Sequence, residues 1–464
     1  MSFVSRQVLR AATRTAAKAF HRITAPTGRR RIEAGAGGLR WQGAGHLPAP
    51  QQATLAARGP AQLRASAAYL NTPQGNRIVE AWAAALVGKG WQACAQHPDA
   101  EERKSLSQDF EAMLRPILLP LARALVRDGE AFVHLRLDTE GDLRPKLIPT
   151  DQVDASLIRD LGNGARIVAG IEFDATDQVA AYHVLKESPG SPFAFYGEAV
   201  RVPAVDMLHV FDPLFPGQVR GLSWLAPVLL KMRDRDEASD ALLMQLKTAS
   251  LLTGFIKSVD GGAGGFEGAA EGNTLNVALE PGAMRLLSEG TDVSFSQPGQ
   301  GHSQAVEFLR AQDREIATGA GLTFEMLTGD LGEANYSSAR VGLIDFRRRA
   351  EMLQLNLIEG QFLRPLWQRW IAVQVLADVI HLNHVDDYLA VRFVPPGWQW
   401  VDPQNEVAAD VAAIEAGLKS REEVVAGRGR DIDELDEERA RDEPGHRSQL
   451  QGQRRQDEPG HHHH

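Results

Sequence analysis

The stretch from Leu322 to Arg349 contains the residues whose types and spacing could do chemistry. Its loop Thr328–Glu333 places two glycines and two acids within six residues, and arginines follow at 340 and 347–349. Carboxylates can hold metal ions, so one hypothesis is a metal-dependent enzyme that processes nucleic acid. Its ligands would be Asp330, Glu333, Asp386 and Asp387. The stretch itself forms no catalytic constellation and is more typical of an exposed or moving loop mounted on a rigid helix.

The element that must position this loop is a long helix. Ser337 or Ser338 can cap it, because a serine oxygen accepts a free backbone N–H at a helix start. Apolar residues then recur at helical spacing, which predicts a helix from Ser338 to about Ile371. We expect Gly360 to interrupt it and Pro365 to kink it.

Other motifs with chemical potential are incomplete. The pair His381 and His384 has metal-like spacing, but no third and fourth ligand stands out, so a surface turn is the better interpretation. Gly221–Leu225 resembles a nucleophile elbow but lacks its last glycine. The glycine-rich run Asp260–Gly268 lacks the Gly-Lys-Ser/Thr of a phosphate loop. The sequence therefore predicts no enzyme, no metal and no cofactor.

Composition is that of a globular protein with charged ends. The 464 residues are 43% hydrophobic and 24% charged, with a formal net charge of −10. Residues 1–64 hold eleven basic residues and one acid, whereas residues 401–460 hold nine basic residues and sixteen acids. The single cysteine, Cys94, excludes an intrachain disulfide and is interpreted as a small core residue. No apolar run is long enough to span a bilayer.

Periodicity predicts an α+β chain. Helices are expected over 53–69, from Asn71-Thr72-Pro73 to about Leu86, and over 101–127. Short, mainly antiparallel strands follow between Gly129 and about Val210. A helix over Arg220–Ser258, with Ser223 as a possible cap, comes next. Further expectations are strands within 274–295, a helix over 303–319, a strand over 391–394, and helices over 405–418 and from Ser420.

Four segments in register resemble the lambda-type portal proteins of tailed phages. They are Gly129–Phe132, Pro216–Pro227, Leu279–Gly282 followed by Leu327–Asp330 and Asn335–Arg340, and Trp400–Pro403 with the helix after it. The resemblance covers residues 52–440. It implies a portal fold: long stem and wing helices, a β-rich wing, a small β clip and a helical crown.

The resemblance also implies a division of the chain into domains. The expected parts are a basic, disordered arm (1–51), a wing (52–219), a stem helix (220–258), a clip (259–302), a second stem helix (303–319), a tunnel loop (320–337), the long helix with the rest of the wing (338–402), a crown (403–440) and a disordered tail with tag residues (441–464).

The function implied by the resemblance is that of a homo-oligomeric ring, typically of twelve subunits, at one vertex of a phage capsid. Double-stranded DNA would pass through its channel without sequence readout during packaging and ejection. The terminase large subunit, neck or connector proteins and capsid proteins would be its partners, in the virion and in the host cytoplasm during assembly, without a membrane. Candidate channel residues are Thr328, Asp330, Glu333, Asn335, Tyr336, Arg340, Arg347 and Arg348. Another neck or tail structural protein remains an alternative.

Overall fold

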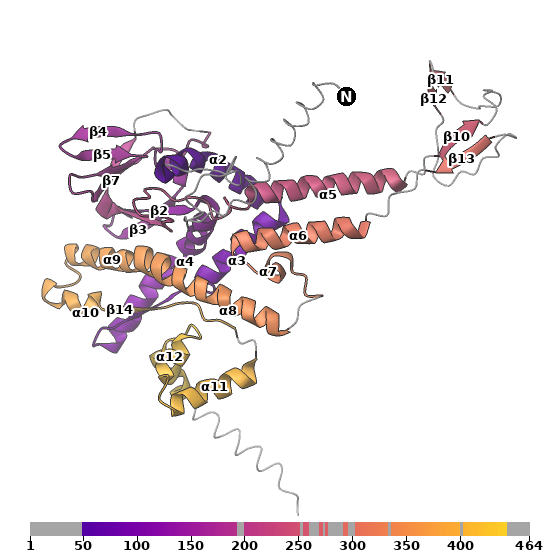
Figure 1. Ribbon diagram of the computed structural model, residues 1–464. Coiled ribbons are helices and arrows are strands. Elements are labelled where there is room, and N and C mark those ends of the chain that lie inside the picture. The colour runs from indigo at the N-terminus through magenta and orange to yellow at the C-terminus, as the bar shows by residue number, and fades with distance from the viewer. Residues whose placement is uncertain are drawn as a thin grey trace, which may run out of the picture. The chain divides into compact units, whose positions relative to one another are not determined.

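The structure is a computed structural model (Figure 1). It describes residues 49–192, 199–250, 254–258, 269–271, 274–276, 291–295, 302–332, 336–399 and 402–442. Contacts divide the chain after Pro50, and the elements described from Gln51 onward belong to one unit.

Three helices and one short strand begin the described chain. They are α2 (Pro50–Asn71), α3 (Pro73–Val87), β1 (Gln92–Ala95) and α4 (Ala100–Asp128). Thr72 caps α3, since its Oγ1 accepts from the backbone N–H of Gly75 at 3.1 Å, and the predicted start of this helix is confirmed. Asp99 caps α4 in the same way. The sequence analysis missed β1.

Two antiparallel sheets follow, as predicted. One has the strand order β3 (Leu143–Ile148), β2 (Glu130–Leu137), β9 (Met207–Phe211). The other runs in sequence order: β4 (Arg159–Gly162), β5 (Ala165–Val168), β6 (Ile171–Phe173), β7 (Val179–Val184), β8 (Val200–Pro203). A small core containing Phe132, Ile171 and Tyr182 joins the two sheets.

The helix expected over Arg220–Ser258 is wrong at both ends. α5 spans Leu229–Ser250, and residues 254–258 form β10 (Gly254–Ser258), which pairs with β13 (Thr291–Phe295). Ser223 lies before α5 and does not cap it; its Oγ accepts from Leu225 instead. A second hairpin joins β11 (Ala269–Glu271) and β12 (Thr274–Asn276). The strand expected at 283–287 lies outside the described residues.

The second half is built on one continuous helical rod. It follows α6 (His302–Ala320) and the short α7 (Phe324–Thr328), and it comprises α8 (Tyr336–Leu353), the π-helix η5 (Gln354–Leu363) and α9 (Arg364–Leu376). Its start at Tyr336 places Ser337 and Ser338 inside the first turn, so the predicted capping role is wrong. Neither Gly360 nor Pro365 breaks it: the wider π turns precede Pro365, which stands at the start of α9.

The described chain closes with α10 (Val385–Leu389), β14 (Val391–Val394), α11 (Pro403–Glu415), α12 (Arg421–Ala426) and a helix over residues 432–442. β14 pairs antiparallel with β1, which joins two segments about 300 residues apart. Ser420 caps α12 at its predicted start. Asp402 caps α11, which begins two residues before and ends three residues before the helix expected over 405–418. The last helix runs two residues beyond 440, where the crown was expected to end.

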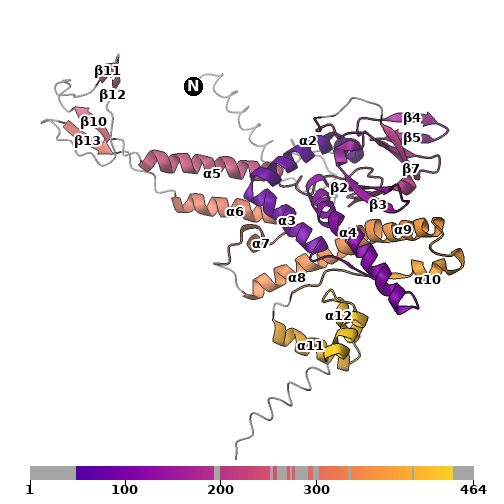
Figure 2. The ribbon, with the colours of Figure 1, turned by 180° about the vertical axis from the view of Figure 1, so that it is seen from behind.

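The main core lies where the helices cross. Figure 2 shows α4 crossing the rod of α8, η5 and α9. There the ring of Phe110 on α4 packs at 4.9 Å, edge to face, on that of Trp367 on α9. Trp82 and Trp367 are both buried. Cys94 is buried too, so its predicted core role is confirmed.

Candidate functional site

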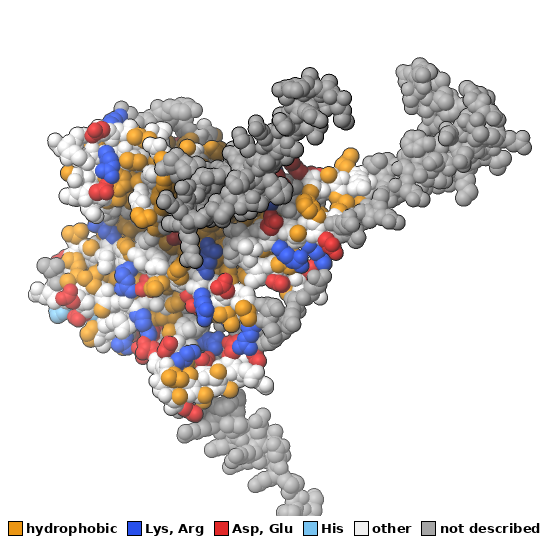
Figure 3. All heavy atoms as spheres, in the orientation of Figure 1, with side chains coloured by type: hydrophobic (Ala, Val, Ile, Leu, Met, Phe, Trp, Pro, Cys, Tyr) orange, Lys and Arg blue, Asp and Glu red, His pale blue; other side chains and the backbone are white. Residues whose placement is uncertain are grey.

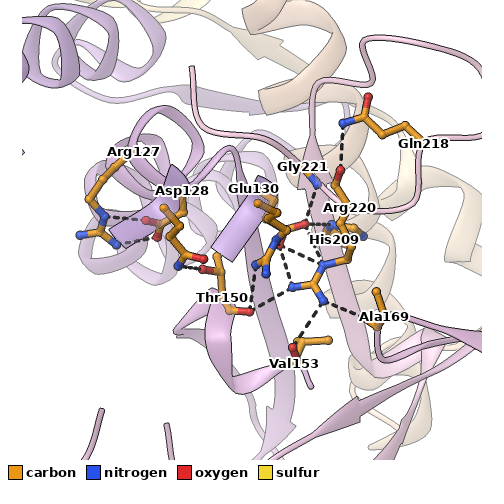
Figure 4. Close-up of polar contacts among 12 residues, drawn as sticks. Arg127, Asp128, Glu130, Thr150, Val153, Ala169, His209, Gln218, Arg220 and Gly221 are labelled. Atoms are coloured by element: carbon orange, nitrogen blue, oxygen red, sulfur yellow. Dashed lines mark hydrogen bonds and ion pairs between the residues drawn. The ribbon is translucent and has the colours of Figure 1, made fainter. Parts of the chain in front are cut away.

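A buried carboxylate, Glu130, lies where α2, both sheets and the segment before α5 meet (Figure 4). Its side chain is fully buried at the first position of β2. Its Oε1 accepts from Arg58 Nη2 of α2 at 2.5 Å and from Arg220 Nη2 at 2.7 Å. Its Oε2 accepts from His209 at 3.0 Å and from the backbone N–H of Gly221 at 2.8 Å. We call these residues the Glu130 network.

Arg220 extends this network into the second sheet. Its Nη1 donates to the Ala169 carbonyl at 2.7 Å and its Nη2 to the Thr150 carbonyl at 3.0 Å. The guanidinium also lies 5.1 Å from the ring centroid of Phe132, a cation–π distance. A single side chain therefore ties the segment before α5 to both sheets.

Burial and opposite charge act against each other in the network. Burial alone would raise the pKa of Glu130, but Arg220 and Arg58 outweigh it and hold the pKa of this carboxyl well below its usual range. Burial lowers the pKa of His209 despite the nearby carboxylate. Because an ionised carboxylate only accepts hydrogen bonds, Nε2 of a neutral His209 must donate. The network then holds two guanidiniums, one carboxylate and a neutral imidazole.

The backbone around the network is fixed by two glycines in contact. A Cβ on Gly221 would lie 2.2 Å from the carbonyl oxygen of Gly129, and a Cβ on Gly129 would lie 2.1 Å from the backbone of Leu222. Neither glycine therefore tolerates a side chain without a backbone shift. The segment after Gly221 is also held by a backbone hydrogen bond, in which Trp224 N–H donates to the Val126 carbonyl at 3.1 Å. These contacts set the point from which α5 departs.

α5 and α6 pack side by side through charged pairs (Figure 1). Arg235 Nε lies 3.1 Å from Asp313 Oδ1, and Asp313 also accepts from Gln74 at 3.3 Å. Lys231 and Glu315 form a more exposed pair at 2.8 Å. The base of this helix pair is therefore bonded to α3, while its sides carry apolar residues that the chain leaves exposed: Leu230, Leu243, Met244, Leu246, Val306 and Phe308.

The predicted loop is shorter than expected, because its first part is helical. Thr328 is the last residue of α7 and donates to the Phe324 carbonyl at 2.8 Å. Asp330 accepts from Arg310 at 3.4 Å and from Gly332 N–H at 3.0 Å. Glu333 and Asn335 lie outside the described residues, and Tyr336 begins α8 without a described side chain.

The three candidate arginines of α8 do not act together. Arg340 Nη2 lies 4.0 Å from Glu406 of α11. Arg347 donates to the Gln399 carbonyl at 2.8 Å and stacks over Trp398 at 5.4 Å. Arg340 and Arg347 thus face the C-terminal helices. Arg348 is exposed, and the described residues provide it with no hydrogen bond or ion pair.

The hypothetical metal ligands are not brought together. Asp330 is paired with Arg310, whereas Asp386 and Asp387 belong to α10, and no described contact joins the two places. Within the part of the chain that the structure describes, no group of three or more His, Cys, Asp or Glu could hold a metal ion. The described helices also include none that is long and apolar enough to cross a membrane.

The sequence analysis missed the Glu130 network, although a signal was present. Glu130 precedes an apolar run at the start of β2, and Arg58 is buried within an alanine-rich helix. Charged residues in such settings are rarely buried unless they are paired. The pairing itself spans 72 and 90 residues, which spacing along the chain does not reveal.

The comparison that decides the family covers most of the elements described above. A family model described as phage portal protein, lambda family, matches residues 40–354, which include the Glu130 network, α5, α6 and α8. The chain belongs to the lambda family of phage portal proteins. The predicted resemblance and the α+β fold class are confirmed.

Two curated portal proteins are similar to the chain in sequence. The "probable portal protein" of Halomonas phage phiHAP-1 is 28% identical over 323 residues, 67% of this chain and 62% of the relative. Portal protein B of Escherichia phage lambda is 21% identical over 351 residues, 66% of this chain and 64% of the relative. The chain therefore spans less than two thirds of the length of these relatives.

Solved structures are similar at lower identity. A chain in the virion of a native gene transfer agent particle aligns with a TM-score of 0.44 and 17% identity, covering 79% of this chain and 92% of that chain. An HK97-family phage portal protein from Corynebacterium diphtheriae aligns with a TM-score of 0.30 and 13% identity, covering 74% and 96%.

Proposed function

We propose that this protein forms a homo-oligomeric portal ring, of twelve subunits, at one vertex of a phage capsid. The observation that carries the proposal is the lambda-family portal match over residues 40–354. The ring conducts double-stranded DNA during packaging and ejection and has no catalytic activity of its own. It is a virion component that assembles in the host cytoplasm.

The exposed apolar side chains of α5 and α6 support assembly. Leu243 and Met244 on α5 are 49% and 61% exposed, and Val306 and Phe308 on α6 are 50% and 53% exposed. Neighbouring copies in a ring would cover them and remove apolar surface from water. We assign α5 and α6 to the stem, with the clip between them over about residues 259–302.

The charge distribution suits a channel that does not hold its DNA. Figure 3 shows acidic and basic side chains interspersed on the face that it draws, without a continuous basic surface. A strongly basic bore would bind phosphates by releasing counterions and would retain the duplex. The formal net charge of −10 and the local pairing of arginines favour passage with little friction. The loop between α7 and α8 is our candidate for the tunnel loop.

The partners follow from the position of each part in such a ring. The terminase large subunit and the neck or connector proteins would dock at the clip, and capsid proteins at the wing (about residues 52–219). Residues 403–440 would form the crown. All of these contacts are between proteins, and none requires a metal or cofactor.

The number of subunits in the purified particle tests the proposal. Native mass spectrometry and negative-stain imaging of the full chain should show a ring of about twelve copies. A protein that stays monomeric at every concentration would contradict the proposal. Shortening Thr328–Glu333 should leave the ring intact and impair packaging or retention of DNA. Loss of the ring itself would contradict the assignment of this loop to the channel.

A further inference from the structure

Helix α8 is apolar on two opposite faces. One face is buried in the core and consists of Phe346, Ala350 and Leu353. The opposite face is exposed and consists of Val341 (68%), Ile344 (43%) and Met352 (51%), continuing into η5 with Leu355 (59%). Successive residues of a helix turn by about 100°, so these four residues lie within one narrow stripe. A helix that is apolar on both sides is normally covered on both sides.

The exposed stripe also carries one cation. Arg348 lies at its middle, four residues before Met352 and four after Ile344. It is exposed, and among the described residues it has no bonded partner. We call Val341, Ile344, Arg348, Met352 and Leu355 the outer stripe. At about 1.5 Å per residue it is about 21 Å long.

The C-terminal helices, by contrast, lack a buried core of their own. Over residues 402–442 the structure contains no buried side chain. Apolar residues of α11, α12 and the last helix instead surround an open groove of about 360 Å³. Its lining consists of Val407, Asp410, Val411, Ile414, Val424, Val425, Arg428, Arg430 and Leu435. We call this the C-terminal groove. A module this small needs a further apolar layer to bury a core.

The outer stripe and the segment that forms the C-terminal groove carry opposite net charge. The two arginines in the groove lining, Arg428 and Arg430, are paired with Asp410 at 3.0 Å and Glu438 at 2.5 Å. Residues 402–442 contain thirteen acidic and six basic side chains, a net charge of −7. In the outer stripe Arg348, which has no bonded partner among the residues that the structure describes, lies among apolar neighbours. An apolar helix with a central cation therefore suits an apolar groove in an acidic module.

The two surfaces of a single chain do not meet. α8 contacts its own C-terminal segment with other residues: Arg347 bonds to the Gln399 carbonyl at 2.8 Å, and Glu351 accepts from Trp398 at 2.9 Å. Around the helix, Arg347 lies about 100° and Glu351 about 60° from Arg348 at the middle of the outer stripe. The described residues of the same chain therefore leave the outer stripe exposed.

We propose that the outer stripe of each copy docks in the C-terminal groove of the next copy. Two different surfaces make this contact, so it is heterologous and closes only when the copies form a ring. The proposal rests on the proposed ring and names one of the interfaces that hold it together. It also supplies the apolar layer that residues 402–442 lack.

A pair of cysteines tests the contact in the full chain. Met352→Cys and Val411→Cys are introduced together on a Cys94→Ala background and treated with a short bismaleimide. Head-to-tail contact should give a ladder of covalent multimers well beyond the dimer on denaturing gels. Each single variant should give no ladder. Peptide mapping should join residue 352 of one copy to residue 411 of another.

A matched control places the second thiol on the opposite face of α11. Ala409 is exposed and about 160° from Val411 around the helix. Replacing Val411→Cys by Ala409→Cys should reduce the ladder about tenfold or more. Rings that cross-link equally in both pairs would overturn the proposal. A protein without rings would instead contradict the proposed function.

The cation gives an independent test. Arg348→Glu should raise the protein concentration for half-maximal ring assembly about tenfold, because it places a carboxylate against an acidic module. Lys146→Glu makes the same change of charge at an exposed position of β3 and should leave assembly unchanged. Equal assembly of both variants would overturn the role of Arg348.

Discussion

The Glu130 network consists of charged side chains that are buried, whereas the outer stripe of α8 consists mainly of apolar side chains that are exposed. In the first, charged side chains lie in the core, and each finds its partners within the same chain. In the second, apolar side chains are exposed to water, and the described residues of the same chain do not cover them. The comparison separates interactions that one subunit makes within itself from surfaces that we propose are covered by a neighbouring subunit. Changes in the network should therefore alter the stability of the subunit, whereas changes in the stripe should alter association.

The largest effect is expected from Glu130→Gln. It removes the carboxylate charge and leaves Arg58 and Arg220 buried against each other, which should cost about 3–5 kcal/mol of the free energy of unfolding. Denaturant unfolding measures the loss. Glu140→Gln, at an exposed turn, should cost almost nothing. A network variant with wild-type stability would mean that these charges do not hold the sheets together.

Next in size is Gly221→Ala. The new Cβ would lie 2.2 Å from the Gly129 carbonyl oxygen, and the backbone shift should cost about 1–3 kcal/mol. Gly59→Ala is the matched control, since nothing lies within 4 Å of its Cβ position in α2. That change should alter the stability little, because the higher helix propensity of alanine is opposed by Pro60, which disfavours the α conformation at a preceding residue with a Cβ. Thermal unfolding of both variants compares them directly.

The pH dependence of stability should report on His209. Its pKa in the folded state lies below the ordinary value of 6.5. The unfolded chain therefore binds a proton first as the pH falls, and stability that is present above pH 6.5 is lost below it, by about 1.4 kcal/mol per unit of difference in pKa. His209→Asn should reduce the loss between neutral pH and about pH 5.5. His381→Asn, at an exposed position, should leave the profile unchanged.

The smallest effect concerns the charged pairs between α5 and α6. Asp313 is 10% exposed and bonded to both Arg235 and Gln74, whereas Lys231 and Glu315 are about half exposed. Double-mutant cycles should give a coupling of about 1 kcal/mol for Arg235–Asp313 and less than about 0.5 kcal/mol for Lys231–Glu315. Equal couplings would show that burial at the base of the helix pair has no energetic consequence.

Features that depend on neighbouring residues could be predicted from the sequence. Thr72 and Ser420 begin helices at the predicted places, because each cap is a local hydrogen bond. Features that depend on distant residues could not. β1 is short and is fixed only by its partner β14. Likewise, the glycines in Gly129–Phe132 and Pro216–Pro227 could be read as motif residues, but not as two backbones in contact.

In the candidate site, too, features fixed by neighbouring residues could be predicted and features fixed by distant residues could not. The position of the loop near Thr328 followed from its glycines and acids, and α8 followed from its periodicity. The partners of Arg340 and Arg347 did not, because Glu406 and Gln399 approach from a segment more than 50 residues away. Basic residues after a loop suggested a surface facing DNA. In the structure Arg340 lies near Glu406 of α11, and Arg347 bonds to the segment before α11.

The π-helical segment Gln354–Leu363 determines how the side chains of α8 are rotated around the rod relative to those of α9. Deleting one residue there would turn α8 by about 100° relative to α9. Arg347 would then leave Trp398, and the outer stripe would point elsewhere. A change in this segment alone would therefore turn every side chain of α8 relative to α9 without altering the sequence of α8.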